Sequence, residues 1–76
     1  MRMRWAIELW NIYGGGYDEF RTKKEALREY YRLKRKIKAD FPKPEYVWKE
    51  TKDGSEITFY SEEEDLLLML SDTRNF

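Results

Sequence analysis

The chain has 76 residues, of which 15 are basic and 15 acidic, so its formal net charge at neutral pH is zero. It contains neither cysteine nor histidine, which excludes disulfides, thiolate or imidazole metal sites and every nucleophile that depends on these residues. Zero net charge gives no overall field that would favour nucleic acid or a membrane surface. Aromatic residues make up 17% of the chain, and because each ring buries a large area we expect residues 1–76 to form a single compact domain.

No apolar stretch is long enough to cross a membrane. The longest run, Leu66 to Leu70, has five residues, whereas a membrane-spanning helix needs about 20. Strand-like alternation follows the N-terminal arginines, where a signal peptide would need an unbroken apolar run. We therefore expect a cytoplasmic protein with no membrane contact.

The N-terminal segment has the pattern of a half-buried strand. From residue 3 to about residue 13 apolar and polar side chains alternate, and Trp5 and Leu9 lie on the same side. Gly14-Gly15-Gly16 then breaks the strand. Residues 17–21 either return as a short paired strand or cross to the next element, and the sequence leaves both interpretations open.

A first helix is predicted over residues 22–39. Thr22-Lys23-Lys24-Glu25 has the form of a capping box, in which the Thr hydroxyl accepts from the Glu25 backbone N–H. Pro42 and Pro44 disfavour helical geometry at the residues before them, so the helix should end near Ala39. The apolar stripe of this helix, at spacings of three and four, consists of Ala26, Leu27, Tyr30, Leu33 and Ile37, and Phe41 is expected to continue it.

Two further strands are predicted around Lys52-Asp53-Gly54-Ser55, because Asp-Gly is the preferred centre of a two-residue type I′ hairpin turn. This turn would place Trp48 opposite Phe59 and Glu50 opposite Ile57. The side of the hairpin that faces the core would then carry Tyr46, Trp48, Ile57 and Phe59. The other side would carry Val47, Lys49, Thr51, Glu56, Thr58 and Tyr60.

A short C-terminal helix is predicted over residues 62–71. Ser61-Glu62-Glu63-Glu64 has the form of a second capping box, and acidic residues suit the positive end of a helix dipole. The predicted fold is α+β in the order β-α-β-β-α, with a small, mostly antiparallel sheet of three or four strands packed against helix 22–39. The sheet face under that helix would consist of Trp5, Ile7, Leu9, Trp48, Ile57 and Phe59.

The apolar run in the predicted C-terminal helix is a candidate contact surface. Five consecutive apolar residues cover almost the whole circumference of a helix, and a sheet can cover only one side of it. The remainder is either covered by the first helix and the C-terminal tail, or it binds a partner or a second copy of the chain. In the second case the contact residues would be Leu67, Leu68 and Met69.

An acidic cluster adjoins this run. It could imitate phosphate charges and occupy a basic nucleic-acid channel of a target protein, or it could serve only as a solvated helix start. The candidate residues are Glu62, Glu63, Glu64 and Asp65.

Trp10 lies on the side of the first strand that the charged residues Arg4 and Glu8 mark as outward. An exposed tryptophan there would be a candidate binding hot spot. Sheet twist, a bulge near the glycines or the second helix would instead bury the ring, and we expect burial.

The basic residues of helix 23–38 provide an alternative surface that could lie along nucleic-acid phosphates. Their charges spread around the helix rather than forming one stripe, and basic residues are also good helix formers that suit a helix C-terminus. The candidate residues for nucleic-acid binding are Lys24, Arg28, Arg32 and Arg35.

No motif for catalysis, a cofactor or a metal accompanies these features. Gly14-Gly15-Gly16 lacks the spacing and the Lys-Ser/Thr pair of a phosphate-binding loop, and the carboxylates lack a positioned base. A small chain rich in aromatic and charged residues without catalytic motifs is similar in kind to the inhibitors that phages use against host defence systems such as CRISPR. This analogy predicts a phage or mobile-element protein without enzymatic activity that acts in the host cytosol. It would be an inhibitor or adaptor that binds a host protein such as a nucleic-acid-handling enzyme, with a homodimer as a further expectation. The alternative is a small nucleic-acid-binding protein that uses the basic helix.

Overall fold

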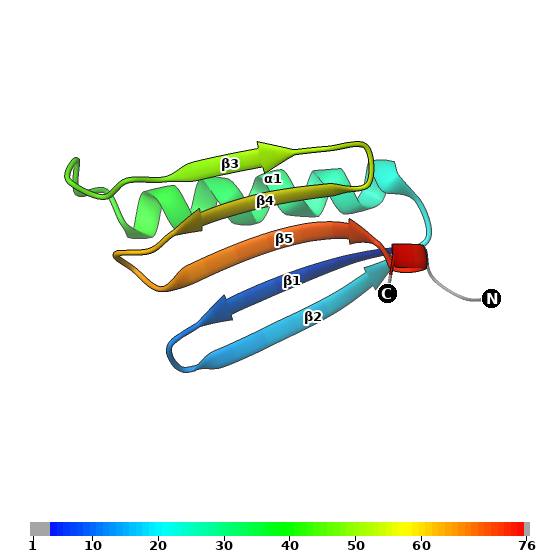
Figure 1. Cartoon of the computed structure of the whole chain (residues 1–76), viewed down its shortest axis with the longest axis horizontal. Coiled ribbons are helices and arrows are strands. Elements are labelled where there is room, and N and C mark those ends of the chain that lie inside the picture. Colours follow the sequence, from blue (N-terminus) through cyan, green and yellow to red (C-terminus); the bar gives the residue numbers. More distant parts are fainter. Residues whose placement is uncertain (1–3, 76) are drawn as a thin grey trace.

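The computed structural model describes residues 4–75, which form a five-stranded sheet with one α-helix on one of its faces (Figure 1). Along the chain the elements are β1 (Trp5–Asn11), β2 (Gly14–Phe20), α1 (Lys23–Asp40), β3 (Lys49–Lys52), β4 (Glu56–Ser61), β5 (Leu66–Asp72) and the short 3₁₀ helix η1 (Thr73–Asn75). The strands lie in the order β2-β1-β5-β4-β3, and every neighbouring pair is antiparallel. The domain is α+β as predicted, but the predicted strand number and the order β-α-β-β-α are wrong.

β1 and β2 form a hairpin whose connection is Ile12-Tyr13. The Asn11 side-chain Oδ1 accepts a hydrogen bond from the Tyr13 backbone N–H at 2.8 Å, which stabilises the turn. Gly14 has a φ of +132°, a conformation that residues with a side chain rarely adopt. The glycine run begins β2, and residues 17–20 pair with β1. Of the two interpretations left open by the sequence, the return as a paired strand is therefore the correct one. The start of the predicted first strand at residue 3 lies outside the described residues.

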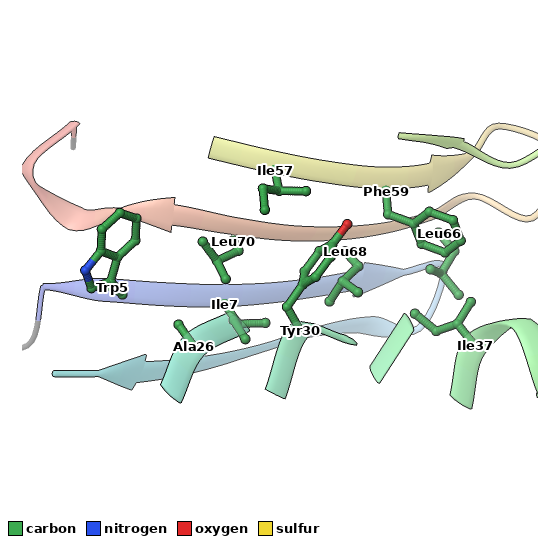
Figure 2. Packing of buried hydrophobic residues seen from close by; sticks show 10 residues of the cluster. All are labelled: Trp5, Ile7, Ala26, Tyr30, Ile37, Ile57, Phe59, Leu66, Leu68 and Leu70. Atoms are coloured by element: carbon green, nitrogen blue, oxygen red, sulfur yellow. The ribbon is translucent and has the colours of Figure 1, made fainter. Parts of the chain in front are cut away.

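α1 follows the local signals that predicted it. The Thr22 hydroxyl accepts the Glu25 backbone N–H at 3.2 Å, and the helix ends at Asp40, shortly before the prolines. Its buried residues are Ala26, Tyr30 and Ile37, and Figure 2 shows their side chains directed at the sheet.

The register predicted for the β3–β4 hairpin is wrong by two residues. Glu50 lies opposite Phe59 and Lys52 lies opposite Ile57. Because side chains alternate along a strand, an even shift leaves each residue on its predicted face. Trp48 therefore still lies on the core side, where its ring stacks on Phe59 with 4.9 Å between the ring centroids.

Asp53 explains the shift. Its backbone N–H donates to the Glu56 carbonyl at 2.9 Å, and its carboxylate accepts the Ser55 backbone N–H at 2.8 Å. This side-chain turn places Gly54 and Ser55 at the tip, and Gly54 lacks the positive φ that a type I′ turn requires.

The predicted C-terminal helix is also wrong. Residues 62–65 form the β4–β5 turn, and Leu66–Asp72 form β5, the central strand, with β1 on one side and β4 on the other. A run of five apolar residues fits a buried strand as well as a helix, and the neighbouring strands decide between the two. Ser61, expected to cap the helix, instead donates its hydroxyl to the Glu63 carboxylate at 2.8 Å.

The helix and the sheet enclose one core. On β5, every second residue from Leu66 to Leu70 lies under α1, whereas Leu67 and Met69 lie on the opposite face. Leu9 and Trp48, predicted for the face under the helix, are partly buried at the border of the core. The core residues, shown in Figure 2, are Trp5, Ile7, Ala26, Tyr30, Ile37, Ile57, Phe59, Leu66, Leu68 and Leu70.

Candidate functional site

The sheet face opposite α1, which we call the open face, has no second layer in the part of the chain that the structure describes. In Figure 1 the helix lies behind the sheet, so the open face is turned toward the viewer. Trp10 and Tyr17 on this face are 48% and 49% exposed, and an exposed apolar patch is typical of an interaction site. The large apolar side chains of the open face come from four adjacent strands and are Trp10, Tyr17, Tyr60, Leu67 and Met69.

Three of these side chains form a row across the sheet. Trp10 of β1 lies opposite Leu67 of β5, and Leu67 lies opposite Tyr60 of β4. Because the leucine is shorter than its two aromatic neighbours, the row is low in the middle. A groove of about 320 Å³, which we call the sheet groove, occupies this position. Its lining residues are Trp10, Asn11, Tyr60, Ser61, Glu62, Asp65, Leu66 and Leu67.

Gly15 determines where the Trp10 ring lies. The two residues are paired across β1 and β2, and a Cβ on Gly15 would lie 2.3 to 2.7 Å from three atoms of the indole. Distances this similar to three adjacent ring atoms place the face of the ring, not its edge, against the Gly15 backbone. The indole is therefore supported on one side by β2, and only a glycine permits this approach.

The β4–β5 turn separates the four acidic residues into different environments. Glu62 and Asp65 line the sheet groove. Glu63 is bound within the turn, where backbone N–H groups and the Ser61 hydroxyl lower its pKa. Glu64 lines a different cleft, next to the C-terminal part of α1.

The backbone of the turn brings the two groove carboxylates to the same end of the groove. The Asp65 backbone N–H donates to the Glu62 carbonyl at 3.2 Å. Asp65 has a φ of +48°, a left-handed conformation that aspartate and asparagine tolerate better than most residues. Among the predicted acidic residues, only this pair lines the sheet groove.

The apolar residues predicted to contact a partner also lie in two different environments. Leu67, Met69 and Trp10 lie together on the open face, and the expected burial of Trp10 is wrong. Leu68 is fully buried under α1 and cannot contact a partner. Sequence reasoning placed Tyr60 on the outer side of its hairpin but did not identify it as a site residue, because its neighbour Leu67 was assigned to a helix.

The exposed side of α1 is basic. Lys24, Arg28, Arg35 and Lys38 follow one another at helical spacings of three, four and seven, so they lie along one line. Arg32 lies beside this line, and its guanidinium Nε donates to the Glu29 carboxylate at 2.6 Å. The basic residues of α1 are therefore spread over the side of the helix that the sheet leaves exposed, and four of them follow one line along it.

Glu50 connects α1 to the outer strands. It accepts hydrogen bonds from the Tyr30 hydroxyl at 2.7 Å and from the Lys34 ammonium at 2.6 Å. Burial alone would raise the Glu50 pKa, but the bonds from Lys34 and Tyr30 lower it to about 2. Burial, and then the bond to Glu50, raise the pKa of Tyr30 far above its usual value. The Glu50, Tyr30 and Lys34 side chains satisfy one another's hydrogen-bonding groups. The network therefore holds α1 on the sheet, and none of these three groups is available as a free acid or base.

Two further ion pairs join Asp72, the last residue of β5, to Arg4 and Arg74. Asp72 is 3% exposed, and its carboxylate accepts from the Arg74 guanidinium at 2.8 Å and from Arg4 at 3.4 Å. The bonds from Arg74, and then the charge of Arg4, lower the pKa of Asp72 to about 2. The carboxylate therefore stays ionised in the folded protein at neutral pH.

Within residues 4–75, no group of three acidic residues lies close enough together to hold a metal ion. None of the helices there is long and apolar enough to span a membrane. No family model, curated protein or solved structure matches this chain, so its function is inferred from the open face and the sheet groove.

Proposed function

We propose that this protein is a binding module without enzymatic activity that holds a partner protein against the open face of its sheet and acts as an inhibitor or adaptor. The observation that supports this most strongly is the row of Trp10, Leu67 and Tyr60 on the open face, in which Trp10 is 48% exposed and the other two side chains are partly buried. Tryptophan and tyrosine are enriched among the residues that dominate protein–protein binding energy. A domain of this size has no structural need to place both in one row on a sheet face that no second layer covers within residues 4–75.

The charge of the open face indicates the charge expected on the surface of the partner. Its strand positions carry three acidic residues, Glu8, Glu19 and Glu56, and one basic residue, Lys49. The β4–β5 turn adds two carboxylates. Nucleobases also stack on aromatic sheet faces, but proteins that bind single strands in this way have basic surfaces that attract phosphates. An acidic aromatic face instead complements a basic protein surface, such as the nucleic-acid channel of an enzyme.

A second candidate function is nucleic-acid binding by α1. The observation in its favour is the line of Lys24, Arg28, Arg35 and Lys38 on the exposed side of the helix. Such a line would contact phosphates, so its affinity should fall steeply as the salt concentration rises. The two candidates use opposite faces of the molecule and can be separated by substitution.

The test compares two double variants with the parent chain. Trp10→Thr with Met69→Thr removes apolar surface from the open face, and threonine is suited to strands. Arg28→Glu with Arg35→Glu reverses charge on α1. Each immobilised protein is exposed to lysate of the host cell, the captured protein is identified and purified, and its affinity is measured by calorimetry. Gel shifts with labelled DNA and RNA are measured in parallel.

We expect the open-face variant to lose the partner and the α1 variant to keep it. Circular dichroism should show that both variants are folded. A salt-sensitive gel shift that disappears with the α1 variant, together with unchanged partner binding by the open-face variant, would reject the proposal in favour of the second candidate.

A further inference from the structure

We infer that the sheet groove receives one arginine side chain of the partner protein. This inference rests on the proposed function and names the contact through which the partner is held. It follows from three properties of the groove, which are its width, its lining and the charge at one end.

The width fits one extended side chain. Trp10 and Tyr60 are separated by the intervening strand β5, so their backbones lie about 9.5 Å apart, twice the spacing of neighbouring strands. Non-bonded carbon atoms are in contact at about 3.5 to 4 Å. The Trp10 ring lies against Gly15, on the side away from Leu67, so the space above Leu67 between the two aromatic side chains has room for a chain of methylene groups.

The lining fits the stem of an arginine. Leu67 forms an apolar floor between the aromatic walls, and long cationic side chains pack their methylene stems along such surfaces. Because the Trp10 indole is supported from behind by Gly15, its outer face is a fixed platform. Guanidinium groups stack on tryptophan faces more often than ammonium groups do.

The end of the groove supplies charge of the complementary sign. Glu62 and Asp65 both line it, and neither takes part in an ion pair with another described residue. A guanidinium presents several N–H donors in one plane, which allows it to bind two carboxylates while its face lies against a ring. A lysine ammonium can bind carboxylates but has no planar face. The phosphates of a nucleic acid would be repelled from the same end of the groove.

The test is an NMR titration of the full ¹⁵N-labelled chain with three blocked tripeptides, alanine-X-alanine, in which X is arginine, lysine or the uncharged isostere citrulline. The signals to follow are the indole N–H of Trp10 and the backbone amides of Asp65 and Leu67. We expect the arginine peptide to shift these signals saturably, with a dissociation constant of roughly 1 to 10 mM for a single side chain. The citrulline and lysine peptides should bind at least about threefold more weakly, because citrulline lacks the positive charge and lysine lacks the planar face.

Substitutions in the β4–β5 turn test whether the arginine binds the two groove carboxylates or responds only to the overall negative charge of the turn. Asp65→Asn removes the charge and keeps a residue that tolerates the left-handed backbone, and Glu62→Gln removes the second charge. Each should weaken the arginine peptide by about two- to fivefold, the range measured for exposed ion pairs. Glu64→Gln removes the same charge from the same turn but outside the groove, so it should leave the affinity within about twofold of the parent, since its charge is screened.

Several results would overturn the inference. They are equal binding of the citrulline or lysine peptide, shifts confined to α1, absence of a saturable shift, or equal effects of Glu64→Gln and Asp65→Asn. The proposed function is tested separately. If the peptide fails but partner capture still requires Trp10 and Met69, only the arginine contact is wrong. If capture does not require them, the proposed function itself is wrong.

Discussion

Replacing Leu68 with alanine tests the assignment of β5 as the central strand. Leu68 has no exposed surface and lies between β1 and β4 beneath α1. Truncating a fully buried leucine to alanine costs about 3 to 5 kcal/mol, because the lost methyl groups leave a cavity that the surroundings fill only partly. A chain of 76 residues has a free energy of unfolding of about 4 to 11 kcal/mol. The substitution should therefore remove a large part of the stability.

Urea unfolding followed by far-ultraviolet circular dichroism measures this loss. Leu67→Ala is the matched control, since Leu67 is the next residue on the same strand but lies on the open face and is only partly buried. We expect its cost to be less than half that of Leu68→Ala, with little change in the dependence of the unfolding free energy on urea. Equal losses, or a greater loss for Leu67→Ala, would refute the assignment of these two residues to opposite faces.

Three further predictions follow from the packing and the charges. Gly15→Ala should displace the Trp10 indole, because the new Cβ would lie 2.3 Å from the ring, and an unchanged indole N–H shift in the NMR spectrum would contradict this. Glu50 and Asp72 have folded pKa values of about 2, below their ordinary values of 4.5 and 3.8, so the stability they contribute is complete above about pH 4.5 and is lost as the pH falls toward 2. The melting temperature should accordingly drop over that window, and equal values at both ends would contradict it. If the open face also binds a second copy of the chain, light scattering at high micromolar concentration should give a mass above 9.4 kDa that Met69→Thr reduces, and a strict monomer would exclude self-association.

Local signals were sufficient to predict α1 and the faces of the β3–β4 hairpin. Thr22 caps the helix and Pro42 follows its end, and both act within a few residues of the boundary they set. The hairpin register depended on a competing local signal. The Asp53 carboxylate accepts the Ser55 backbone N–H, and this moved the turn by one residue relative to the preferred Asp-Gly position.

The central strand could not be predicted from local signals. Nothing within Leu66–Leu70 distinguishes a helix from a strand that is bonded on both sides, because its partners β1 and β4 are supplied by other parts of the chain. The same limit applies to the site. Trp10 and Leu67 could be named individually, but they become neighbours only through a pairing of strands more than 50 residues apart. Tyr60 joins them through the same strand.

The most direct test of the open face as the binding surface is site-specific photocrosslinking with benzoylphenylalanine in cells that express the protein. Two positions are compared, Tyr60 on the open face and Tyr31 on α1, where the side chain is exposed. Both replacements keep an aromatic ring, so the fold should be retained. We expect irradiation to attach a partner protein at position 60 and not at position 31. A crosslink at position 31 alone would place the binding surface on the helix and contradict the assignment of the open face as the site of partner binding.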